Sequence, residues 1–517
     1  MNLTWNKGYE DYTDTEHWLP RLQYLLESQT RFTPETAACM DNSELLDKTE
    51  ETEELLRFYL SSDDPDSLEN LLQKQKAMLH LCAERCPDDA KTRYLNMEYH
   101  RISALLFQTG GNLSQAAGYY KQALACAQNC FSLLQTDSSF TPEQRAYIGW
   151  ACIEVYKETS FLYDTVYGGR QSYAVLSDAL PLLTWTEPFL KNTPGIQDQA
   201  GDLYASVAGA AYLNQDPGKG KDCFQRAVKL YHEMGNQYDS DFYYARSIWN
   251  QSAYGMQAWL AEGNPQPMLD CRTAADHFLS EHDPEPRDRG IVLGALGIIL
   301  MQESAACQQN ERLPEAVALS RSGLAHLKQS LELLENDYKG KTGYYYLTVN
   351  AIAAKVFGSY VGGLDFAGVQ LYYNGDKNEA LQSFQKALSM LDHKENYGMG
   401  ESAELLLRAE IMEYLALLAV DREQAEQAVH WGSQSADLAE ESARKTGNPA
   451  AWEIVILSSA LVAEICLLLK NKKQAGIYAD KGILACDCLA QSLPSNPRLE
   501  MRRSLTTYKK RASRRFF

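Results

Sequence analysis

Few residues in this chain of 517 are spaced as catalytic chemistry requires. The run Gly340-Lys-Thr342 ends like a phosphate-binding loop, but Glu335 stands where such a loop needs its leading glycine, and Leu331 to Asn336 is predicted to be helical rather than extended. The sequence contains neither a Gly-x-Ser-x-Gly nor a His-Glu-x-x-His motif. We therefore expect no enzymatic activity and no bound cofactor.

Metal-binding residue types are present, but their spacing is poor. His277 and His282 are five residues apart, which does not place two ligands on one face of a helix. Cysteine pairs such as Cys82 and Cys86 lie on one helical face, but no Cys-x-x-Cys pair is matched by a second one. We expect surface histidines, buried cysteines and no metal.

The segments that carry these residues are predicted to be almost entirely helical. Most windows place apolar residues three and four positions apart, and strand-like alternation is scarce. Segments such as Glu379 to Leu391 and Arg422 to Arg444 have high helix propensity. Short turns such as Asn374-Gly-Asp-Lys377 separate them. The sequence predicts an all-α protein built from antiparallel helix pairs.

A pattern of small residues recurs along these helix pairs. A small residue is followed three positions later by a mostly apolar one. Twelve positions after the first small residue comes a second small one. A residue that is often aromatic follows at sixteen positions, and a third small residue follows at nineteen. Small residues where two helices cross let the backbones approach to about 8–9 Å, and each pair leaves an apolar face that the next must cover. The clearest copy is Gly368, Leu371, Ala380, Phe384 and Ala387, and a looser one is Ala416, Ala425, Val429 and Gly432, with Glu413 in the first position.

This pattern resembles the tetratricopeptide repeat (TPR) superfamily over roughly residues 91–490, with Leu364 to Leu391 as the strongest match. The resemblance implies an α-solenoid, a right-handed superhelix of about 8 helix pairs with a concave inner wall. Most units are 45 to 64 residues apart. The usual period is about 34, so the chain is more similar to the long-helix TPR-like arrays of bacterial regulators.

The two ends of the chain differ from this array in charge. Residues 1–90 contain 20 Asp+Glu and 8 Lys+Arg, and are predicted to form an acidic N-terminal helical region. Residues 491–517 are predicted to form a basic C-terminal tail or capping helix, which allows self-association with the acidic region. The whole chain has a net charge of −19, which argues against general nucleic-acid binding.

The TPR resemblance also implies which residues meet a partner. In that family the first helix of each pair lines the concave wall, with inward positions six and three residues before, and one and four after, the first small residue. Aromatic and Met side chains there would supply contact area, and Asn, Arg and Asp would hold a peptide backbone and its termini. The alternative is that most of these side chains are core. The candidate partner-binding residues are Tyr212, Arg246, Trp249, Asn250, Met256, Trp259, Asp365 and Tyr372.

The N-terminal residues and the most apolar stretches bear on location. Met1 to Asp11 contains no apolar run, so we expect no signal peptide. Ile291 to Met301 and Ile454 to Leu469 are too short to span a bilayer and are predicted to be buried core helices. Twelve cysteines without a secretion signal favour reduced thiols and a cytoplasmic protein.

These observations together favour a cytoplasmic scaffold or adaptor without catalytic activity, which binds a protein or peptide segment in the concave groove of a TPR-like solenoid. One alternative is a peptide-sensing regulatory receptor, similar to the bacterial TPR-type regulators, that acts on another protein. Direct DNA binding is disfavoured, because residues 1–90 are acidic and contain no convincing helix-turn-helix. The other alternative is a subunit of an enzyme complex.

Overall fold

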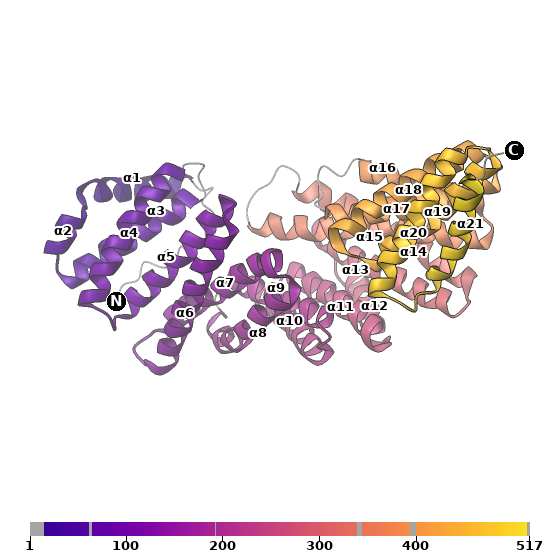
Figure 1. Cartoon of the computed structure of the whole chain (residues 1–517). Helices are drawn as coiled ribbons and strands as arrows, with labels where there is room; N and C mark the ends of the chain where they lie inside the picture. The colour runs from indigo at the N-terminus through magenta and orange to yellow at the C-terminus, as the bar shows by residue number, and fades with distance from the viewer. Residues whose placement is uncertain (1–14, 61–64, 192, 339–343, 393–399, 514–517) are drawn as a thin grey trace. The chain divides into compact units, whose positions relative to one another are not determined.

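The computed structural model describes residues 15–60, 65–191, 193–338, 344–392 and 400–513, and within these ranges it contains helices and turns but no β-strand (Figure 1). The chain divides into two compact units, Met1–Leu269 and Asp270–Phe517. The predicted domain boundary at residue 90 coincides with the start of a helix at Ala90, and the one at residue 490 falls inside a helix. The division into three domains stays a prediction.

From α3 to α11, consecutive helices of the N-terminal unit pack against one another. Their buried side chains form a large core that extends along the chain from Leu56 to Ala258. The helices are α1 (Thr15–Arg31), α2 (Pro34–Cys39), α3 (Asn42–Leu60), α4 (Pro65–Arg85), α5 (Ala90–Thr109), α6 (Leu113–Thr136), α7 (Pro142–Tyr167), α8 (Gly169–Thr186), the 3₁₀ turn η1 (Glu187–Phe189), α9 (Pro194–Leu213), α10 (Pro217–Tyr238), α11 (Asp241–Glu262) and α12 (Gln266–Glu281), which crosses into the second unit.

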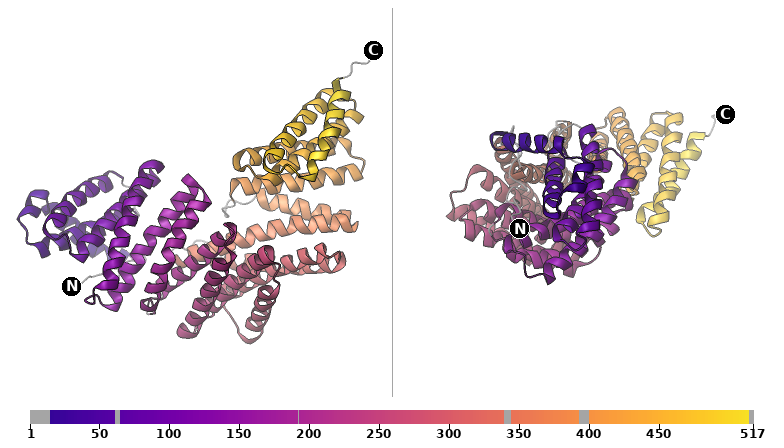
Figure 2. Two further views of the ribbon diagram at one scale, coloured as in Figure 1. Left: turned by 60° about the horizontal axis from the view of Figure 1, so that its bottom comes forward. Right: turned by 90° about the vertical axis from the view of Figure 1, so that its left-hand side faces the viewer.

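The C-terminal unit repeats the same arrangement of neighbouring helix pairs. From α17 onward each helix packs against the next, as the orange-to-yellow helices in Figure 2 show. The helices are α13 (Pro286–Gln309), α14 (Leu313–Tyr338), α15 (Tyr344–Asn374), α16 (Lys377–Asp392), α17 (Glu401–Asp421), α18 (Ala425–Thr446), α19 (Pro449–Leu468), α20 (Lys472–Ser492), η3 (Pro497–Glu500) and α21 (Met501–Ser513). The predicted all-α, TPR-like fold of stacked helix pairs is confirmed.

One type of turn joins the helices within six of these pairs. The last linker residue donates its backbone N–H to a carbonyl five residues earlier, and the residue before the donor has a positive φ. This is the Schellman motif, which satisfies the final carbonyls of a helix. The donor and acceptor pairs are Asn112–Phe107, Asp216–Ala211, Arg312–Cys307, Asp376–Leu371, Gln424–Ala419 and Asn471–Cys466, with distances of 2.8–2.9 Å.

The recurring turn corrects the alignment of one predicted repeat. In the other five turns the acceptor lies three residues after the first small residue of the repeat. In the α17–α18 pair the acceptor is Ala419, so the repeat begins at Ala416, which is fully buried. The predicted alignment placed Glu413 first and was therefore wrong by three residues. The predicted repeat has Ala425 as the first small residue of the second helix, whereas Ala428 is the fully buried residue at that position.

Small residues are required where helices cross closely, both within a pair and between neighbouring pairs. A Cβ atom on Gly368 in α15 would lie 2.7 Å from the ring of Phe384 in α16. A Cβ atom on Gly432 in α18 would lie 2.8 Å from Val462 in α19. Carbon atoms in protein cores do not approach this closely, so the pattern of small residues sets the distance between the helices.

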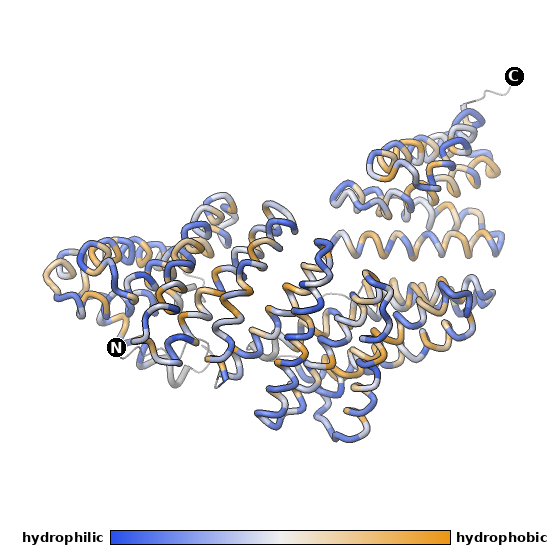
Figure 3. Tube along the Cα trace, turned by 90° about the horizontal axis from the view of Figure 1, so that it is seen from below, coloured by the Kyte–Doolittle hydropathy of each residue, from blue (hydrophilic) through white to orange (hydrophobic). Residues whose placement is uncertain are grey.

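The two most apolar stretches lie in α13 and α19, and these are the two helices among the described residues that are long and apolar enough to cross a membrane. In α13, 72% of the most apolar 18-residue window is buried inside the protein, and in α19 the share is 56%. Core helices commonly show such burial. Figure 3 shows apolar and polar residues alternating along most other helices, as expected where each buries one face.

Much of the basic C-terminal segment forms α21, which packs on α19 and α20. Leu505 is fully buried against this surface. The Nζ of Lys509 lies 2.6 Å from Asp480, and a guanidinium nitrogen of Arg502 lies 2.9 Å from Asp487. Part of the positive charge is therefore paired within the unit, and no contact of this helix supports the predicted self-association.

Replacing Gly368 by Ala tests the crossing constraint. We expect Gly368→Ala to lower the free energy of unfolding by about 1–3 kcal/mol, because the new methyl group must displace the Phe384 ring. The matched control is Gly362→Ala on the same helix, where a Cβ atom meets nothing within 4 Å. That control should stabilise by about 0.5–1 kcal/mol. Urea unfolding followed by circular dichroism measures both, and equal effects would contradict the constraint.

Candidate functional site

Six of the eight predicted partner-binding residues lie in the N-terminal unit. Tyr212 in α9 is buried, with its ring centre 6.2 Å from that of Phe224 and its hydroxyl 3.3 Å from Glu262. Trp249 and Asn250 in α11 are also buried. Met256 and Trp259, farther along α11, are half-buried and keep some contact with solvent.

Arg246 lies in a buried ion-pair cluster between α9, α10 and α11. Its guanidinium pairs with Asp202, approaches Asp198 at 3.6 Å and donates to the Tyr231 hydroxyl at 2.7 Å. Burial raises the pKa of Asp198 to about 6, although Arg246 opposes that shift. The side chain of Asn250 donates to the backbone oxygen of Arg246 at 2.9 Å. Arg246 therefore links three helices, whereas the partner of Asn250 lies within α11.

The Arg246 cluster predicts a large cost for losing the cation. Arg246→Met should lower the free energy of unfolding by about 3–5 kcal/mol, because Asp198 and Asp202 would lose their buried counter-charge. The control is Lys229→Met, which removes an exposed pair with Glu233 and should cost about 0–1 kcal/mol. Urea unfolding distinguishes the two, and a cost for Arg246→Met no larger than that of the control would be inconsistent with the cluster.

The other two predicted residues lie in the C-terminal unit, near a group of acids. Asp365 in α15 is 5% exposed and interacts electrostatically with Glu410 and Glu413, which are half-buried on α17. Tyr372, two turns after Asp365, is half-buried, and its ring centre lies 5.9 Å from that of Tyr414 on α17. We call Asp365, Glu410 and Glu413 the acidic triad.

Burial and mutual repulsion favour the neutral forms of the acidic triad. Burial, followed by the charges of Glu410 and Glu413, raises the pKa of Asp365 well above its usual range. Burial, followed by Glu410, raises the pKa of Glu413 to about 7, although Arg498 lowers it. The pKa of Glu410 is also raised by burial. The triad therefore tends to hold protons near neutral pH and takes on negative charge only at a cost in stability.

The triad should make the protein less stable as the pH rises. Carboxyl groups whose pKa is raised by folding hold protons more tightly in the folded state, so their stabilisation is complete below about pH 4 and is lost as the pH rises through about 7. Asp365→Asn should therefore raise the midpoint of thermal unfolding at pH 8 and leave it nearly unchanged at pH 4.

The matched control for Asp365→Asn is Glu426→Gln, which removes one exposed charge from α18. It should lack the gain in the midpoint of thermal unfolding at pH 8 that is expected for Asp365→Asn. Because Asp198 and Glu158 in the N-terminal unit titrate in the same range, only the difference between variant and wild type reports on the triad. A pH-independent effect of Asp365→Asn would refute this account.

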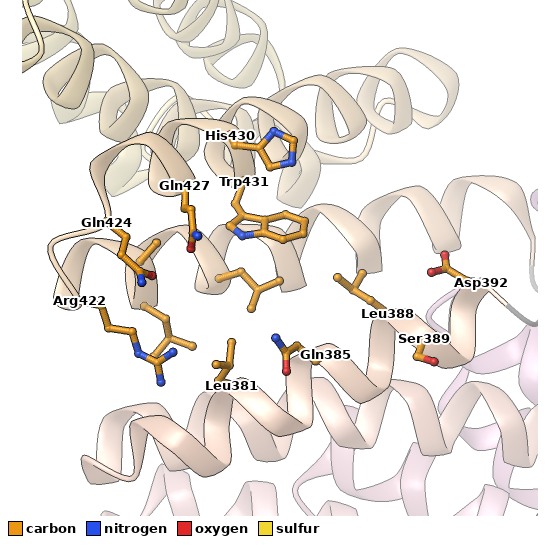
Figure 4. Close-up of a pocket in the computed structure, with 13 residues that line it drawn as sticks. Leu381, Gln385, Leu388, Ser389, Asp392, Arg422, Gln424, Gln427, His430 and Trp431 are labelled. Atoms are coloured by element: carbon orange, nitrogen blue, oxygen red, sulfur yellow. The ribbon is translucent and has the colours of Figure 1, made fainter.

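A groove lies on the second helices of two neighbouring pairs in the C-terminal unit (Figure 4). Its volume is about 560 Å³. Trp431 and Gln427 of α18 point across it toward Gln385 and Leu388 of α16. Leucines and Trp431 provide apolar surface, and glutamines provide amide groups. The lining residues are Leu381, Gln385, Leu388, Ser389, Asp392, Leu415, Leu418, Ala419, Arg422, Gln424, Gln427, His430 and Trp431.

The polar groups of this groove are available to a ligand. Among the described residues, no hydrogen bond joins the side-chain amides of Gln385, Gln424 or Gln427 to another protein group. Trp431 is half-buried, with the ring of His430 packed edge-on at 5.1 Å. A surface with apolar patches and free amides can bind a polypeptide, which presents side chains and backbone groups together. None of these residues was among the predicted eight.

The lining gives no indication of catalysis or metal binding. In the described part of the chain, no group of three or more His, Cys, Asp or Glu side chains has an arrangement that could hold a metal ion. His430 is the only histidine of the groove, and its pairing partner is an aromatic ring rather than a carboxylate or a nucleophile. The arrangement of these groups is suited to binding.

Comparisons with known proteins show similarity at the level of fold. No protein-family model matches the chain, and no curated protein matches its sequence. It is similar to the apo form of RapI, with a TM-score of 0.40 and 11% identity over 86% of this chain and 98% of that one. It is also similar to a STAND protein with a tetratricopeptide repeat sensor from Pyrococcus horikoshii, with a TM-score of 0.33 and 12% identity over 91% and 66% of the two chains.

A third similar structure is the human IFIT1 dimer with PPP-AAAA, with a TM-score of 0.30 and 12% identity over 88% of this chain and 96% of that one. Similarities of this size concern the arrangement of helix pairs. We infer no ligand and no activity from them.

Proposed function

We propose that this protein is a non-catalytic interaction scaffold that binds a segment of a partner protein in the groove between α16 and α18. The observation that carries the proposal is the mixed lining of that groove, with leucines and a half-buried Trp431 beside unpaired glutamine amides. Tryptophan is the residue type most enriched among those that dominate binding energy at interfaces. The glutamine amides would pair with the backbone of the bound segment.

A cytoplasmic location is part of this proposal. The twelve cysteines are free, and eight of them are buried. Free thiols persist in a reducing compartment. The half-buried residues of the predicted stripe, Met256, Trp259 and Tyr372, are proposed as further contact surfaces within their own units.

The proposal is tested by selecting short random peptides against the full chain and measuring the affinity of those selected. Trp431→Ala should weaken their binding by at least about tenfold, because it removes the largest apolar surface of the groove. The control is Leu484→Ala, which removes a half-exposed apolar side chain from α20 outside the groove. Isothermal titration calorimetry measures each affinity. Failure to select any peptide, or equal affinity for Trp431→Ala and the wild type, would refute the proposal.

A further inference from the structure

The acidic triad brings side chains of two first helices together. Glu410 and Glu413 lie one turn apart on α17, and Asp365 comes from α15. With the corrected repeat that begins at Ala416, Glu413 is three residues before the first small residue, as Asp365 is before Gly368. The two carboxyl groups therefore occupy equivalent positions in consecutive helix pairs.

Asp365 provides a second observation that is independent of the two glutamates. Its side chain is 5% exposed, and its Oδ1 atom is fully buried without a hydrogen-bond partner among the described residues. A buried carboxyl oxygen without a partner costs free energy that folding normally avoids. The oxygen belongs to a side chain that interacts with Glu410 and Glu413, so the unpaired acceptor forms part of the same group.

Two other acidic clusters of this protein each contain an arginine. In the N-terminal unit, Arg246 serves Asp198 and Asp202. In the same unit the Nη1 of Arg101 lies 2.6 Å from Glu158, and its Nε and Nη2 donate to Glu98. No salt bridge or hydrogen bond joins a basic side chain to the acidic triad in the part of the chain that the structure describes.

The one arginine that acts on Glu413 among the described residues is already engaged. Arg498 lowers the pKa of Glu413, but its Nε lies 3.8 Å from Glu453, with which it forms a salt bridge. The triad also fails as a metal site, because no acidic grouping among the described residues has a suitable arrangement. An organic cation fits better, since Tyr414 is near enough for the charges of Glu413 and Glu410 to contribute to its raised pKa, and aromatic rings attract guanidinium and ammonium groups.

We propose that Asp365, Glu410 and Glu413 bind the guanidinium or ammonium group of an arginine or lysine side chain in a bound polypeptide. The half-buried glutamates keep some contact with solvent, and Asp365 supplies a buried acceptor that has no partner of its own among the described residues. The proposal rests on the proposed function only in taking a polypeptide as the source of the cation. It defines a partner segment that is basic.

The probe is a hexa-arginine peptide, with hexa-citrulline as its uncharged counterpart of the same shape. Calorimetry on the full chain at pH 8, where the triad ionises most readily, should show binding of hexa-arginine and none of hexa-citrulline. Asp365→Asn and Glu410→Gln should each weaken hexa-arginine binding by about tenfold or more, because each removes a charge-assisted contact. Glu426→Gln, which removes an exposed charge from α18, should weaken it less than about twofold.

Equal weakening by Glu426→Gln and the two triad variants would overturn the proposal, because hexa-arginine would then respond only to the net charge of −19. Absence of hexa-arginine binding would overturn it as well. If peptides that require Trp431 still bind in that case, the proposed function stands and only the cation site fails. Loss of folding does not confuse the result, since Asp365→Asn should unfold at a higher temperature than the wild type at pH 8.

Discussion

The close crossing of neighbouring helices, within pairs and between them, constrains the whole chain. Gly368 faces the ring of Phe384, and Gly432 faces Val462, at distances that leave no room for a Cβ atom. Helices that approach so closely share a narrow contact and leave the rest of their apolar surface uncovered, so another pair must pack on them. This explains why α19, whose window is among the most apolar of the chain, lies against α18, α20 and α21.

Within this framework, the buried charges lie mostly on first helices, and the apolar groove lies mostly on second helices. The Arg246 cluster and the acidic triad involve first helices of their pairs, whereas the groove with Trp431 lies mostly on second helices. The helix α17 contributes to both, through Glu413 on one face and Leu418 on another. The charged groups of the Arg246 cluster lose their solvation but join three helices through ion pairs. Among the described residues, the carboxyl groups of the triad have no paired cation, and a ligand can supply one.

The fold was predictable because its signals are local. Small residues at fixed spacing and short turns identified the helix pairs, and the strongest match, around Gly368, agrees with the crossing that the structure contains. The sites were not predictable in the same way. Arg246 finds Asp202 from 44 positions away, which no spacing rule anticipates. Trp431 was not predicted, because the TPR resemblance places the partner-binding residues on the first helix of each pair. The predicted repeat in α17 was also misaligned by three residues. The equivalent positions of Glu413 and Asp365 in their helix pairs were therefore not predicted.

The uniform turn within six helix pairs has a consequence for how such a chain changes over time. Its left-handed position holds glycine at Gly375 but a charged residue at Glu311, Glu423 and Lys470, with φ close to 60° in these three. The turn keeps its backbone geometry although its residues differ. A complete helix pair can therefore be duplicated or deleted in one genetic step without changes to the turns on either side. The length of the array and the chemistry of any single pair can therefore evolve as separate traits.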